Sequence, residues 1–154
     1  MRYDVIAALA LLLTVAQSKG CGDSKPPASN EPTPASTVRA QAMDLTRLVD
    51  SLRANGAKVE VAGEVSQPFF SVKGKSLKVT GGDIQVFEYS DARTAQGQAS
   101  LVSADGSEVG RNKIGWVAPP HFYKADRIIA LYLGDSPEVI KSLEAVLGKQ
   151  FAGR

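Results

Sequence analysis

The residue best suited to acid–base chemistry in this sequence is His121, the only histidine. Histidine is the one side chain whose charge changes near neutral pH without help from its surroundings. A catalytic histidine also needs a nucleophile or an orienting carboxylate beside it, and the carboxylates here are scattered singly along the chain. The serines that lie near predicted turns are outside the G-x-S-x-G pattern of a nucleophilic serine: Ser71, Ser90, Ser103 and Ser136. A non-enzymatic protein is therefore favoured, and a hydrolase or other enzyme centred on His121 is the alternative.

His121 lies in the densest group of aromatic and proline residues, which runs from Trp116 to Tyr123. Rigid aromatic and proline side chains offer apolar area at low entropic cost, which suits a binding surface. Phe69 and Phe70 form a second unusual stretch, and in an extended backbone they point to opposite faces. Exposed rings from both stretches would make an apolar patch of the kind that marks partner sites, whereas the alternative is that they belong to the rim of the core. The candidate binding surface consists of Phe69, Phe70, Trp116, His121, Phe122 and Tyr123.

No metal or cofactor site is expected. Cys21 and His121 are the only cysteine and the only histidine, so a Cys/His metal site is excluded. A glycine-rich phosphate loop is also absent, because Gly81-Gly82 is typical of a hairpin turn and Gly106–Gly110 lacks a preceding strand and a following helix. The net charge is +2 at pH 7, and no cluster of lysine and arginine is interleaved with aromatic residues. Nucleic acid is therefore not an expected partner.

Cys21 lies soon after a short apolar run, Val5 to Ala16. The run is shorter than the about 20 residues that span a bilayer core as a helix, and its length is typical of a signal peptide. The segment resembles a bacterial lipoprotein signal, in which the cysteine receives a diacylglycerol group before cleavage on its N-terminal side. Gly20 fits that pattern, whereas Ser18 and Lys19 depart from the aliphatic and small neutral residues usual there. The alternative is an ordinary secretory peptide, which would leave Cys21 as a free thiol.

The stretch after Cys21 has nothing to bury. Residues 22–37 hold four prolines and no large apolar residue, a composition typical of a disordered or polyproline-II tether. Such a tether reaches up to about 50 Å from a membrane. We therefore predict a lipoprotein-type signal peptide over residues 1–20, the lipid-attachment cysteine and tether over residues 21–37, and a single domain over residues 38–154.

Two helices are predicted in the first half of this domain. Apolar residues recur at positions i, i+3, i+4 and i+7 from Leu45 to Leu52, and Asn55-Gly56 ends the helix. A second helix is predicted from Ala92 to Val102. Either Ser90 or Asp91 serves as its N-cap.

The third predicted helix has the clearest beginning. Ser136 is the expected side-chain cap, Pro137 suits the first helical position, and Glu138 favours the positive end of the helix dipole. Gly148 ends the helix, because glycine readily adopts the left-handed conformation found there.

Two hairpins are predicted, one turning at Gly81-Gly82 and one at Ala125-Asp126. The run Ile128–Leu133 is almost continuously apolar, which favours a central strand covered on both faces. A strand, a turn and a helix follow one another twice, from Asp83 and from Asp126, either as a true repeat or by chance. The sequence thus predicts an α+β fold, an antiparallel or mixed sheet with about three helices. Two of these, in the repeated units, are expected to pack on one face.

Four motifs together resemble a group of small, uncharacterised bacterial proteins with lipoprotein signals: Pro68-Phe69-Phe70, Val86-Phe87-Glu88-Tyr89, Trp116-Val117-Ala118-Pro119-Pro120-His121-Phe122 and Leu131-Tyr132-Leu133-Gly134-Asp135. The resemblance covers residues 39–154 and the signal. It implies a protein of the cell envelope, periplasmic or at the cell surface, and no known activity. The favoured function is a non-enzymatic binding or accessory module, held at the membrane by a lipid on Cys21. Its expected partner is another envelope protein or a small apolar ligand.

Overall fold

The computed structural model describes residues 42–154. The predictions for the signal peptide, for Cys21 and for the tether of residues 21–37 fall outside the described residues. Both clusters of buried apolar side chains lie wholly within residues 42–154. This part of the chain therefore contains its own hydrophobic core.

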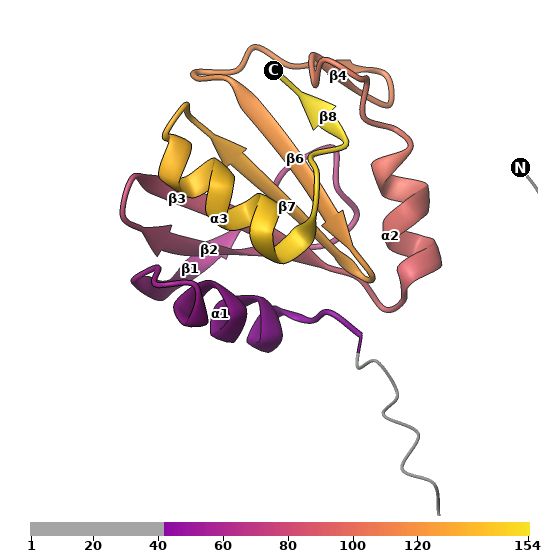
Figure 1. Cartoon of the computed structure of the whole chain (residues 1–154). Helices are drawn as coiled ribbons and strands as arrows, with labels where there is room; N and C mark the ends of the chain where they lie inside the picture. The colour runs from indigo at the N-terminus through magenta and orange to yellow at the C-terminus, as the bar shows by residue number, and fades with distance from the viewer. Residues whose placement is uncertain (1–41) are drawn as a thin grey trace, which may run out of the picture. The chain divides into compact units, whose positions relative to one another are not determined.

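The described residues form a six-stranded antiparallel sheet in the order β1-β2-β3-β7-β6-β8 (Figure 1). The strands of this sheet are β1 (Val59–Val65), β2 (Gly74–Val79), β3 (Gly82–Glu88), β6 (Pro120–Ala125), β7 (Ile128–Leu133) and β8 (Ala152–Gly153). A separate two-stranded ladder joins β4 (Glu108–Val109) to β5 (Asn112–Lys113). The predicted α+β fold with an antiparallel sheet is confirmed.

Both predicted hairpins are present. β2 pairs with β3 through a turn at Thr80 and Gly81, and Gly81 has a φ of 100° that a side chain would strain. β6 pairs with β7 through a turn that contains Asp126, whose φ is 46°. Aspartate tolerates this left-handed region better than most residues, because its side chain bonds locally.

The helices within residues 42–154 are α1 (Leu45–Ala54), α2 (Ala92–Ala99) and α3 (Pro137–Leu147). Asp91, not Ser90, caps α2, since its Oδ1 accepts the backbone N–H of Thr94 at 2.9 Å. α2 ends before the expected Val102, because Val102 pairs in a β-bridge with Val109. The expected side-chain cap of α3 is wrong: the Ser136 hydroxyl makes no capping bond to the helix backbone and donates to Glu138 Oε2 at 2.7 Å.

The central strand β7 has apolar side chains on both faces, and all its residues up to Tyr132 are buried. α1 and α3 cover one face, where their apolar side chains pack with Ile84, Ala130 and Tyr132. α2 covers the opposite face, where Ala95 packs in a cluster with other strand side chains. The expectation that both repeated units place their helices on one face is therefore wrong. A sheet that is apolar on both faces needs cover on both.

Candidate functional site

His121 lies on β6 and is buried, with 6% of its surface exposed. Its Nδ1 atom forms a hydrogen bond of 2.7 Å with Gln150 Oε1, and its ring stacks on Tyr132 with centroids 6.0 Å apart. Among residues 42–154, no serine hydroxyl or carboxylate lies within hydrogen-bonding distance of this ring. The geometry is that of a packed histidine and not of a catalytic pair.

The six residues of the predicted binding surface do not share one face. Successive side chains of a strand point to opposite faces, so Phe122 faces α2 while His121 and Tyr123 face α1 and α3. Tyr123 has no exposed surface and belongs to the core beneath these helices.

The other four rings do meet, although Phe69 and Trp116 are far apart in the sequence. Phe69 packs edge-on against Trp116 with centroids 5.8 Å apart, and Trp116 packs against Phe122 at 5.9 Å. Phe70 packs against Phe69 at 5.0 Å. Phe70 and Phe122 are buried, and Phe69 and Trp116 are half-buried. These rings form the rim of the core on the α2 face, with two of them reaching the surface.

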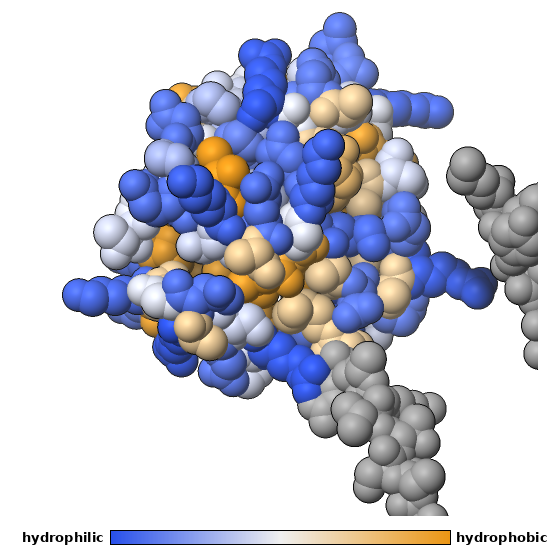
Figure 2. Space-filling model, viewed as in Figure 1, coloured by the Kyte–Doolittle hydropathy of each residue, from blue (hydrophilic) through white to orange (hydrophobic). Residues whose placement is uncertain are grey.

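The described residues also form a pocket of about 350 Å³, which no sequence pattern indicated. It lies where the end of α1, the β2–β3 turn and the beginning of α3 come together. The residues that line it are Leu52, Asn55, Gly56, Ala57, Lys58, Val79, Thr80, Ile84, Glu138, Val139 and Ser142. On the same face of the molecule, apolar surface gathers along the junction of α1 and α3 (Figure 2). We call this hollow the α1–α3 pocket.

The α1–α3 pocket has an apolar floor and a polar rim. Leu52, Ile84 and Val139 are core residues, whereas Lys58 and Glu138 carry opposite charges at the exposed rim. The Ser136 hydroxyl is the main cause of the lowered pKa of Glu138, because it donates a hydrogen bond to the carboxylate. This arrangement favours binding an apolar group.

Two walls of the α1–α3 pocket are joined by one side chain. The Tyr132 hydroxyl donates to the Gly81 carbonyl oxygen in the β2–β3 turn and accepts the Ser136 N–H in front of α3. The turn can approach the ring because residue 82 is glycine: a Cβ atom there would lie 2.9 Å from Tyr132 Cε2. Tyr132 is therefore a positioning residue for the pocket.

The chain matches no protein-family model, no curated protein and no solved structure. Within residues 42–154, no helix has the length and apolar character needed to cross a bilayer. The same residues contain no group of three or more His, Cys, Asp or Glu side chains that could hold a metal ion. Geometry is therefore the basis on which a function can be assigned.

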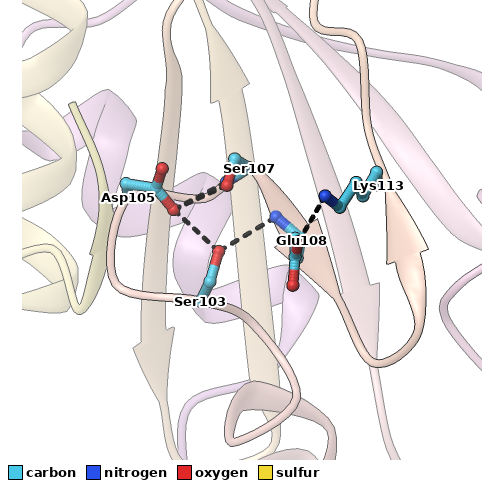
Figure 3. A network of polar contacts seen from close by, with 5 residues as sticks. All are labelled: Ser103, Asp105, Ser107, Glu108 and Lys113. Carbon is cyan, nitrogen blue, oxygen red and sulfur yellow. Dashed lines mark hydrogen bonds and ion pairs between the residues drawn. The ribbon is translucent and has the colours of Figure 1, made fainter.

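The clearest polar network holds a turn in place (Figure 3). Asp105 Oδ1 accepts bonds from the hydroxyls of Ser103 and Ser107 and from the Ser107 backbone N–H. These bonds lower the pKa of Asp105 to about 2, and the bond from the Ser107 backbone N–H has the largest effect. The turn then presents the Gly106 carbonyl oxygen, which accepts the Trp116 indole N–H at 2.6 Å. The role of the network is structural, and it fixes the position of Trp116.

Proposed function

We propose that this protein is a non-enzymatic binding module, anchored in the bacterial cell envelope by a lipid on Cys21. The anchor is supported by the lone cysteine after a signal-like apolar run and by the resemblance to lipoprotein-signal proteins. The proline-rich residues that follow Cys21 would link the anchored cysteine to the domain.

The observation that carries the binding function is the α1–α3 pocket. Its volume of about 350 Å³ lies within the range of small-molecule sites, roughly 300–1,000 Å³. The half-buried Ala57 and Val79 line it together with core side chains, so a bound apolar group would leave water for an apolar surface. We propose that it takes a small apolar ligand, or an apolar side chain of another envelope protein.

The alternative of an enzyme centred on His121 has less support. The ring is hydrogen-bonded to the side-chain amide of Gln150 and stacked on Tyr132. These contacts support a structural role for it. No observation places a reacting group beside it, so we do not propose a reaction.

The test is a titration with N-phenyl-1-naphthylamine, an uncharged apolar probe whose fluorescence rises when it leaves water. Residues 21–154 are expected to bind the probe at one site. Ser142→Trp would fill the pocket from its rim and is expected to lower the affinity by about tenfold or more, since a tenfold change corresponds to about 1.4 kcal/mol.

The matched control is Ala145→Trp, which puts the same ring on an exposed position of the same helix, outside the pocket. It is expected to bind the probe like the unchanged protein. Absence of binding by the unchanged protein, or equal binding by all three proteins, would contradict the proposal. Circular dichroism melts verify that each variant is folded.

A further inference from the structure

We infer that the loop of residues 114–119, between β5 and β6, rests on the lipid bilayer, with Trp116 and Val117 at the interface. This surface is separate from the α1–α3 pocket. The inference rests on the proposed anchor at Cys21, because that anchor keeps the loop near a membrane.

The first observation is the exposure of Val117. Its side chain is 94% exposed, compared with 48% for Val61, the next most exposed large hydrophobic residue within residues 42–154. Val117 is not isolated, because it follows the half-buried Trp116, which packs on the half-buried Phe69. Phe151, 37% exposed, also packs against Phe122, with centroids 6.1 Å apart. The loop is thus the projecting tip of a larger apolar edge.

The second observation is that the loop is held in this position. The Trp116 indole N–H donates to the Gly106 carbonyl oxygen, and the ring packs against Phe69 and Phe122. These contacts fix the half-buried ring, and its exposed part carries no unsatisfied polar atom. Two prolines at 119 and 120 then lead directly into β6. Tryptophan is enriched at membrane interfaces, where its ring lies among the headgroups.

The third observation is the charge beside the loop. Arg154 lines a hollow together with Trp116 and Pro119, and Arg111 is exposed in the turn between β4 and β5. Among the described residues, neither arginine has an ion-pair partner. Lys113 and Glu108 form an ion pair, and the carboxylate of Asp105 is held in bonds to Ser103 and Ser107. The arginines would favour contact with anionic lipid headgroups.

The length of chain between Cys21 and the domain supports a membrane as the occupant. From Cys21 to residue 42, the chain spans at most about 70 Å at full extension. A surface held this close meets the bilayer at a high effective concentration, so a weak contact is enough to dock the domain.

The chain allows a specific experiment, because Trp116 is its only tryptophan and Cys21 its only cysteine. Residues 21–154 are coupled through the Cys21 thiol to a maleimide lipid in vesicles of phosphatidylethanolamine and phosphatidylglycerol. A second set of vesicles contains a doxyl-labelled lipid, which quenches fluorophores in the bilayer. We expect the emission of Trp116 to shift to shorter wavelength and to be quenched by the doxyl group.

Val117→Asp is expected to lower the docking constant of the tethered loop, which is the ratio of docked to undocked protein, by about tenfold. Val61→Asp is the matched control: it puts the same charge on an exposed valine of β1, at the opposite end of the sheet, and is expected to leave quenching unchanged. Absence of quenching in the unchanged protein, or equal losses in the two variants, would overturn the inference. A shift that arises only when solubilised envelope proteins are added would also overturn it, in favour of a protein partner. Because the chemical coupling replaces the natural anchor, a negative result concerns the loop and leaves the lipid on Cys21 and the α1–α3 pocket as separate questions.

Discussion

The hydroxyl of Tyr132 donates a hydrogen bond of 3.0 Å to the carbonyl oxygen of Gly81, which joins the end of β7 to the β2–β3 turn. The same hydroxyl accepts the Ser136 N–H at 3.2 Å, directly before α3. One phenol group therefore holds two walls of the α1–α3 pocket at a fixed separation. The pocket and the stability of the fold depend on the same atom.

Tyr132→Phe is expected to lower the free energy of unfolding by about 1–2 kcal/mol. The change removes the hydroxyl that hydrogen-bonds both the Gly81 carbonyl oxygen and the Ser136 N–H. The measurement is urea denaturation followed by circular dichroism. The control is Tyr123→Phe, since the buried Tyr123 hydroxyl has no hydrogen-bond partner among the described residues. That change is expected to be neutral or stabilising, and an equal loss in both variants would contradict this role for Tyr132.

Gly134→Ala is expected to destabilise the protein by about 3 kcal/mol, through backbone strain and overpacking. Gly134 has a φ of 151°, and a Cβ atom there would lie 2.5 Å from the Tyr132 hydroxyl oxygen. Gly97→Ala is the contrasting change, because Gly97 lies inside α2 with nothing within 4 Å of its Cβ position. It is expected to stabilise the protein by about 0.5–1 kcal/mol. Thermal melts that rank the two variants in the reverse order would contradict this packing.

Asp91 should make the fold sensitive to acid. Its carboxylate accepts the Thr94 backbone N–H first of all, and then the hydroxyls of Ser90 and Thr94, which lowers its pKa from 3.8 to about 2. Because the folded pKa lies below the unfolded one, the stabilisation is complete above about pH 4 and is lost as the pH falls through about 2. Asp91→Asn keeps a good N-cap residue without the charge, so the stability difference from the unchanged protein should shrink over this range. If the free energies of unfolding of the two proteins, measured by urea melts, changed in parallel with pH, this contribution would be ruled out.

Cys21→Ala tests the proposed anchor. In cells grown with a clickable fatty acid, the unchanged protein is expected to carry the label and the variant is not, because the thiol is the proposed attachment atom. The readout is in-gel fluorescence of the purified full-length protein. An unlabelled wild-type protein would exclude the lipid anchor, and a labelled variant would place the acyl group elsewhere.

The local elements were predictable because their signals lie within a few neighbouring residues. Three local signals were interpreted correctly, because each acts on the backbone within a few residues: Asp91 before α2, Pro137 at the start of α3 and the turn at Asp126. The central position of β7 was also readable from its apolar run. Because that run is apolar on both faces of the strand, both faces of the sheet need cover. The run therefore argued against placing both helices of the repeated units on the same face.

The candidate site was harder to predict, because it depends on contacts between distant segments. The walls of the α1–α3 pocket come from around Asn55, Thr80 and Val139, and no short pattern connects them. Unlike the pocket, the separation of Phe122 from His121 and Tyr123 was predictable from the sequence. It follows from the alternation of side chains along the predicted strand, which is β6 in the structure.

The most direct test of the α1–α3 pocket is a nuclear magnetic resonance titration of isotopically labelled residues 21–154 with N-phenyl-1-naphthylamine. We expect the largest shifts of backbone amide signals on Gly56, Thr80 and Ser142, which line three sides of the pocket. Shifts confined to the Trp116 loop, or no saturable shifts at all, would contradict this expectation.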